Sequence, residues 1–201
     1  MTLTVGNQTL SVGGAASGIS TSDVATLIKN NTPYQFIAKV DAAGGTTVDF
    51  SNSLNDTDGF SAYRIILDNM TIASNTNNLY MRIASGGTIQ TSSIYGWALV
   101  RGNGSSAGQF NQESQDSRWK LAPSLDISTA YFGTIDLNNT GEGVKTGAIW
   151  NVGGGGSSRQ SKFSFGSGNV DFNAQISGFN IQTNGINFTG GSVRLYGVNN
   201  V

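Results

Sequence analysis

The sequence predicts an all-β protein: an antiparallel β-sandwich of jelly-roll type, preceded by a short N-terminal arm and one short helix. Three observations support this class. The 28 glycines and the many Asn, Ser and Thr residues favour turns and strands over helices. Apolar and polar residues alternate over short runs, as in strands that bury one face. These runs recur every ~8–12 residues, a spacing typical of a sandwich.

Residues 1–33 are predicted to form an attachment segment outside the sandwich. Residues 1–19 are small and polar, which fits either an extended arm that anchors on a partner or a frayed terminus. Residues 20–30 carry the predicted helix, which begins at Ser and Thr N-caps and stops before Pro33. This helix is too short to be stable alone, so it must pack on the sandwich or on a partner. The predicted contact residues are Leu3, Val5, Leu10 and Val12 on the arm and Val24, Leu27 and Ile28 on the helix.

Residues 34–201 are predicted to form the sandwich domain. Its first strands are Tyr34–Val40, with Phe36, Ala38 and Val40 on one face, and Val48–Phe50. The central stretch, Phe60–Arg101, then holds three alternating runs separated by turn-forming residues. Together they predict a three-stranded antiparallel meander with one buried face. The residues expected in the core are Tyr63, Ile65, Leu67, Leu79, Met81, Ile83, Tyr95, Trp97 and Leu99.

Gly102–Leu121 is the least regular part of the sequence. A flexible Gly- and Ser-rich lead-in is followed by a segment that concentrates charge around one tryptophan. Arg118, Trp119 and Lys120 are candidate loop contacts, because an exposed Trp gives much contact area to a sugar or a protein partner. A loop Trp more often tucks beneath its own loop, and this interpretation stands beside the first.

The rest of the chain is predicted to return to short strands. A Gly190-Gly191 pair between the last two indicates a hairpin. The predicted strands are Leu125–Ile127, Gly133–Leu137, Gly147–Val152, Lys162–Phe165, Phe172–Ile176, Phe179–Ile181, Ile186–Phe188 and Val193–Tyr196.

Composition excludes several function classes. The chain has no Cys and no His, so disulfides, thiolate chemistry, the usual neutral-pH base and the commonest metal ligand are missing. Only 11% of residues are charged and the net charge is −1, which argues against nucleic-acid binding. No apolar run approaches the ~20 residues of a membrane span. Met1–Val5 lacks the features of a signal peptide, so synthesis in the cytoplasm is expected.

Two polar stretches are candidate chemical sites. Asn55–Gly59 superficially resembles a calcium loop, but its alignment puts Leu54 at the first ligand position and Ile65 where a bidentate Glu should lie. Glu113 and Asp116 form the other dense acidic pair that a glycosidase would need, yet a solvated loop explains their spacing better. We therefore predict no catalytic, metal-binding or cofactor-binding residue, and expect that the protein is not an enzyme.

Three pieces of the chain share a further pattern of strands and turns. They are Tyr34–Val40 followed by Val48–Phe50; Tyr63–Met70 leading to Leu79–Ile83 and Gly86-Gly87; and Gly168-Asn169 with the ending Gly191–Gly197. Together they resemble a family of β-sandwich virion proteins of tailed bacteriophages, of tail-fibre, knob or head-decoration type. The resemblance spans roughly residues 34–198. The family often places Gly-Asn close before its final Tyr-Gly strand, whereas Asp171–Thr189 intervene here.

The resemblance implies a structural protein on the outside of a phage particle. On this basis we expect a capsid decoration (cement) protein that is anchored by its N-terminal segment, with the virion as its location. Its expected partners are other virion proteins, such as the major capsid or tail proteins, and further copies of itself, for example in a trimer. The alternative expectation is a tail fibre or knob that recognises a host-surface glycan. The resemblance implies no catalytic residue in this chain.

Overall fold

A computed structural model describes the chain at residues 2–5, 8–11, 32–54, 59–60, 62–74, 77–103, 106–125, 130–138, 143, 145–155 and 161–199. Every regular element in these residues is a β-strand, and all the strand pairs are antiparallel. This confirms the all-β, sandwich-like class. Within the same residues, no helix is long and apolar enough to cross a membrane.

The strands form three sheets. Their bounds are β1 Thr2–Val5, β2 Gln8–Ser11, β3 Tyr34–Asp41, β4 Thr47–Phe50, β5 Ala62–Ile72, β6 Asn77–Ser85, β7 Thr88–Ile89, β8 Tyr95–Asn103, β9 Ser106–Asp116, β10 Trp119–Leu125, β11 Tyr131–Asn138, β12 Gly147–Gly155, β13 Ser161–Val170, β14 Gly178–Gln182 and β15 Phe188–Val198. The larger sheet has the order β3-β15-β5-β11-β12-β13-β8-β9. The smaller has the order β10-β6-β14-β4, with β7 paired to β6, while β1 and β2 pair with each other.

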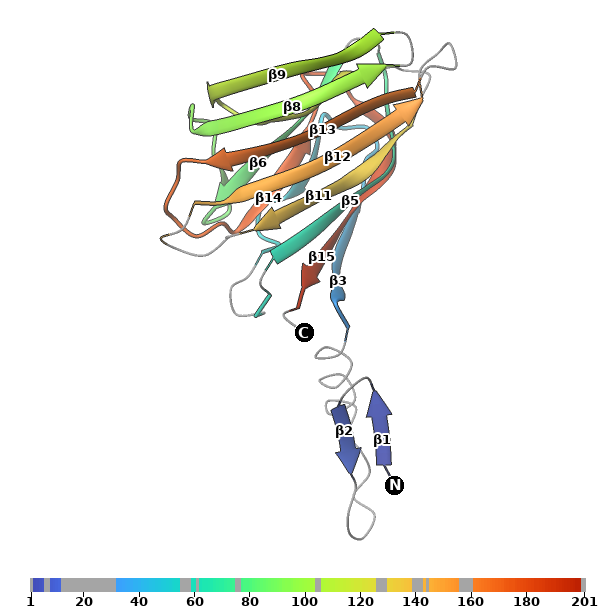
Figure 1. The fold of residues 1–201 in the computed structure, drawn as a ribbon, viewed down its shortest axis with the longest axis vertical. Coiled ribbons are helices and arrows are strands. Elements are labelled where there is room, and N and C mark those ends of the chain that lie inside the picture. Colours follow the sequence, from blue (N-terminus) through green and yellow to red (C-terminus); the bar gives the residue numbers. More distant parts are fainter. Residues whose placement is uncertain are drawn as a thin grey trace.

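The two larger sheets pack face to face. Figure 1 shows the eight-stranded sheet as one broad layer from β9 to β3, with β6 and β14 of the second sheet behind it. A single apolar core lies between them, and it includes the stacked rings of Phe50 and Phe179, whose centroids are 4.9 Å apart. All nine residues expected in the core from the central stretch are buried, so the predicted alternation is confirmed.

The predicted meander is wrong in its connectivity. β5 and β8 lie in the larger sheet, separated by three other strands, and β6 belongs to the smaller sheet. The three apolar faces still meet, because inner faces of both sheets point into the same core. Alternation along a strand therefore identified the buried side but not the sheet to which the strand belongs.

Two glycine-rich or irregular segments are strands rather than turns. β15 runs straight through Gly190-Gly191, so the predicted hairpin is wrong. The pairing with β5 shifts register on both sides of Gly190, and Gly191 has a φ of 98°, so the pair marks a β-bulge. The segment Gly102–Leu121, expected to be irregular, contains β9, which pairs with β8, and the start of β10. Conversely, Phe172–Ile176 contains no strand.

Phe36 is exposed, which contradicts its expected place on one face with Ala38 and Val40. The pairing of β3 with β15 shifts between Leu195 and Tyr196, so Ala38 pairs with Leu195 but Phe36 pairs with Tyr196. The extra residue reverses the alternation, and the Phe36 ring packs edge-on against Tyr196 instead.

The predicted attachment segment is described only in part. β1 and β2 form a two-stranded antiparallel hairpin that includes the backbone of Leu3, Val5 and Leu10. Val12, the helix predicted over residues 20–30, and its contact residues Val24, Leu27 and Ile28 lie outside the described residues.

Candidate functional site

The outer face of the eight-stranded sheet carries six exposed apolar side chains on five neighbouring strands. Each is between 42% and 61% exposed, whereas an apolar side chain of this size is usually buried. They come from β8, β9, β11, β12 and β13 and are Val100, Phe110, Phe132, Ile149, Phe163 and Phe165. We call this set the apolar face.

The strand register makes the apolar face continuous. Phe110, Val100 and Phe165 lie directly opposite one another on β9, β8 and β13. Phe163 is two residues from Phe165 on the same side of β13, and Gly153 lies between it and Phe132 across β12. Directly opposed side chains have Cβ atoms ~4.5–5.5 Å apart, so these residues form neighbouring rows rather than isolated points.

Glycines on neighbouring strands allow two of the rings to lie flat against the sheet. A side chain at Gly102 would overlap the Phe163 ring, at 2.4 Å, so this ring lies across the neighbouring strand β8. Gly153 similarly lies 3.9 Å from the ring of Phe132, measured from an ideal Cβ. Rings laid over glycine present flat, apolar surface to the outside.

The inward side of β13 explains why its phenylalanines point outward. Gly166 and Gly168 face the core, and ideal Cβ atoms there would lie 2.5 Å from the indoles of Trp150 and Trp119. These two indoles are at most 1% exposed and fill the space that inward side chains of β13 would need. The small residues of β13 are therefore inside, which leaves Phe163 and Phe165 for the outer side.

Charge at the margin of the apolar face is neutralised. Asp136 on β11 accepts two hydrogen bonds from Arg64, with Nε–Oδ1 and Nη2–Oδ2 distances of 2.6 and 2.8 Å. Arg64 also donates to the Tyr34 hydroxyl at 2.6 Å, and its guanidinium lies over the Tyr34 ring. The hydrogen bond with Asp136 raises the pKa of Arg64. This bidentate pair neutralises the charge of Asp136 at this part of the margin.

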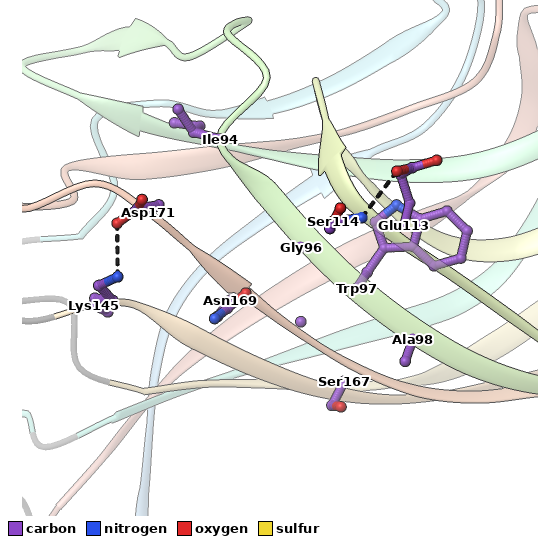
Figure 2. Close-up of a pocket in the computed structure, with 11 residues that line it drawn as sticks. Ile94, Gly96, Trp97, Ala98, Glu113, Ser114, Lys145, Ser167, Asn169 and Asp171 are labelled. Carbon is purple, nitrogen blue, oxygen red and sulfur yellow. Dashed lines mark hydrogen bonds and ion pairs between the residues drawn. The ribbon is translucent and has the colours of Figure 1, made fainter.

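A hollow of about 630 Å³ adjoins the apolar face at the start of β8 and the end of β13. Figure 2 shows Lys145 and Asp171 on one side of it, Glu113 and Ser114 on the other, and Asn169 between. Lys145 and Asp171 form an ion pair at 2.7 Å, and Glu113 accepts a hydrogen bond from the Ser114 backbone at 2.9 Å. The hollow thus offers hydrogen-bonding groups without a concentration of one charge.

The three predicted loop contacts lie elsewhere and are engaged within the chain. Trp119 is fully buried at the start of β10, so its ring is not available to a sugar or a partner. The Arg118 guanidinium lies 3.6 Å from the centroid of the Tyr80 ring, and the Lys120 ammonium lies 4.9 Å from that of Trp97. These cations therefore stack on aromatic rings of their own molecule.

Of the candidate acidic pair, Glu113 and Asp116, one residue has a structural role. Asp116 accepts hydrogen bonds from the indole of Trp97 at 3.0 Å and from the backbone of Ser117 at 2.6 Å, which fixes the turn between β9 and β10. Glu113 lies on the same edge strand and is exposed. In the part of the chain that the structure describes, no group of three or more acidic side chains is placed to hold a metal ion.

Comparison of the chain with protein-family models, with curated proteins and with solved structures finds no match. The site must therefore be interpreted from its own geometry. A broad apolar sheet face is suited to contact with another macromolecule.

Sequence reasoning did not identify the apolar face. It placed a strand at Lys162–Phe165, but an alternation of Phe with Ser and Gly predicts that the phenylalanines point inward. The signal that would have helped is the run Gly166-Ser167-Gly168. Its two glycines point to the side opposite Phe163 and Phe165, and their small size leaves room for the large indoles of the core.

Proposed function

We propose that this protein is a non-enzymatic structural protein on the exterior of a bacteriophage particle, in which the apolar face contacts a neighbouring subunit. The most specific form of the proposal is a capsid decoration (cement) protein, anchored by residues 1–33. The apolar face is the observation that carries it, because a monomer exposed to water gains nothing from such a surface.

We also propose that the sandwich is of jelly-roll type, and the strand order supports this. Eight strands in chain order, β3, β4, β5, β6, β10, β11, β14 and β15, can be numbered one to eight. The order in one sheet is then 1-8-3-6, and in the other 5-4-7-2. This is the pairing order of a jelly roll, a fold used by viral capsid and lectin domains. Strands β8, β9, β12 and β13 extend the first sheet beyond those eight.

The size of the apolar face supports a subunit contact. An aromatic side chain can bury ~150–250 Å², so six half-exposed apolar residues present on the order of 600 Å². A standard protein interface buries about 800 Å² on each partner, and its centre is depleted of charge. The side chains between the six, such as Ala98, Asn151 and Ser167, are small and uncharged. A homo-oligomer, with a trimer as one expected state, would cover this area.

The test is a double substitution, Phe163→Ser with Phe165→Ser, in the full-length protein. Both side chains are exposed, so the fold should be retained, while self-association measured by light scattering should weaken at least about tenfold. Phe36→Ser is the matched control, since Phe36 is equally exposed but lies on β3 at the opposite edge of the sheet. Equal effects of the two changes, or none from the double substitution, would contradict an interface at the apolar face.

The anchoring role of the N-terminal segment needs a separate test. A chain that starts at Asn31 retains every strand of the sandwich, because β3 begins at Tyr34. It should fold, as judged by circular dichroism, and should fail to bind particles that lack the protein. A truncated chain that unfolds would assign the segment to the core, and one that binds particles normally would remove the anchor.

Host-glycan recognition by a tail fibre or knob is the second candidate, and the hollow is the observation that favours it. Trp97 lines it together with Asn169 and Glu113, a mixture of aromatic and hydrogen-bonding groups that suits a sugar. The change Ser167→Trp would fill the hollow. Binding on a glycan array that is lost in this variant would support the receptor, whereas binding only to particles would support decoration.

A further inference from the structure

Three residues with hydrogen-bond donors occupy neighbouring positions on the inner side of the eight-stranded sheet, near the end of β8 and the start of β13. Arg101 on β8 lies directly opposite Ser164 on β13. Trp150 on β12 lies opposite Gly166, two residues along β13 from Ser164. Its indole Cε2, the atom bonded to Nε1, is 2.5 Å from the position that a Gly166 Cβ would take. The indole therefore lies over β13 at Gly166, on the inner side that Ser164 also occupies.

Each of the three has a buried polar atom with no hydrogen-bond partner among the described residues. Arg101 Nε, Ser164 Oγ and Trp150 Nε1 are buried atoms without an acceptor, and Ser164 and Trp150 are each only 1% exposed. The other two indoles differ in this respect. Trp97 Nε1 donates to Asp116 at 3.0 Å and Trp119 Nε1 donates to the Asn169 carbonyl at 3.1 Å.

Among the residues that the structure describes, Arg101 has no ion-pair partner. Arg64 and Arg194 each form an ion pair with an aspartate, and Arg82 donates to the Ser117 carbonyl at 3.0 Å. Arg101 instead has Ser164 on one neighbouring strand and Gln109 on the other. Neither side chain carries a negative charge, so the guanidinium faces only neutral groups across the strands.

The chemistry of these donors selects the class of group that would satisfy them. Guanidinium and indole N–H groups only donate, and buried donors without acceptors are unfavourable. A water molecule accepts about two hydrogen bonds and brings no charge. An oxyanion offers several acceptor lone pairs and neutralises the guanidinium as well. We propose that Arg101, Ser164 and Trp150 form a binding site for one oxyanionic group, a carboxylate or a phosphate.

Of the three residues, Arg101 is the most exposed. Arg101 is half-buried rather than enclosed, and its neighbour Gln109 is exposed on β9, the last strand of the sheet. An anion reaching the site can be a free ion such as inorganic phosphate, or a carboxylate of a partner chain. Both would present negatively charged oxygen acceptors to the same three donors.

The three indole N–H signals of the full-length protein test the site in a ¹H–¹⁵N spectrum. Trp150→Phe identifies the Trp150 signal. Titration with inorganic phosphate, at constant sodium chloride, should move that signal with saturation, while the bonded indoles of Trp97 and Trp119 stay in place. Acetate is the second probe. A shift with both anions supports a site that accepts a carboxylate of a partner, and a shift with phosphate alone supports a free phosphate.

Substitutions then decide which groups bind. Arg101→Gln should abolish the shift, and Ser164→Ala should raise the apparent dissociation constant by about tenfold, the loss of one charge-assisted hydrogen bond. Arg118→Gln is the control, because it removes one positive charge from the turn between β9 and β10. The proposal is overturned if no anion moves the Trp150 signal, if all three indoles move alike, or if Arg118→Gln has the effect of Arg101→Gln.

Discussion

Replacing Trp119 with alanine should destabilise the folded protein by about 4–6 kcal/mol. The side chain is fully buried, and truncating a buried Trp costs ~3–5 kcal/mol through lost contacts and the resulting cavity. Its indole packs edge-on against Tyr95 and donates a 3.1 Å hydrogen bond to the Asn169 carbonyl. Losing the bond leaves that carbonyl without this donor, which adds about 1 kcal/mol.

The expected readout is a large fall in Tm. For a chain of this length, 1 kcal/mol corresponds to about 2–4 °C, so Trp119→Ala should melt roughly 10–20 °C lower by circular dichroism. Trp119→Phe keeps most of the ring and should fall by less. Phe110→Ala is the control, because an exposed aromatic residue should change stability by only about 0.5 kcal/mol. A Trp119→Ala protein that melts within about 2 °C of wild type would show that the residue is at the surface, and the packing argument would fail.

Three further predictions address other parts of the core. Gly168→Ala should lower Tm by several degrees, since overpacking costs about 1–3 kcal/mol, while Gly147→Ala, whose new Cβ would be 3.7 Å from its nearest atom, should leave it unchanged. A thermal melt of each variant compares them, and similar values would contradict the predicted clash. Burial raises the pKa of the Tyr95 phenol above its usual value of about 10. The neutral phenol therefore stabilises the folded state at lower pH, and this stability is lost as the pH rises above about 10 toward the pKa of the folded state. Urea unfolding at about pH 9 and about pH 11 should show this loss, and Tyr95→Phe should reduce it. Met81→Asp buries a charge at a fully enclosed position and should cost several kcal/mol, so near-normal melting would mean that the wrong face of β6 was assigned to the core.

The alternation of apolar residues was enough to predict strands and the direction in which they face. Met81 and Ile65 are both fully buried, as their sequence positions indicated. The division into sheets was not predictable in the same way, because β5 and β6 have the same alternation yet lie in opposite layers. A residue pattern reports burial on one side, whereas the choice of layer depends on pairing with strands far away in the chain.

The apolar face was not predictable because its cause lies on other strands. Phe163 and Phe165 point outward since Trp150 and Trp119 occupy the space beneath β13. A single-strand pattern contains no information about indoles contributed from β12 and β10. The bulge at Gly191 was missed for a related reason: its ideal Cβ would lie 2.6 Å from the Asn69 carbonyl, a contact between residues distant in sequence.

The position of the last two strands determines when the chain can fold. β15 lies between β3 and β5, and β14 lies between β4 and β6, so each sheet closes only when residues 178–198 arrive. During synthesis, the early strands must wait with unpaired edges while more than half of the chain is still to be made. Such non-local pairing slows folding and exposes the nascent protein to aggregation. Emergence of residues 178–198 from the ribosome should therefore be the event that starts cooperative folding.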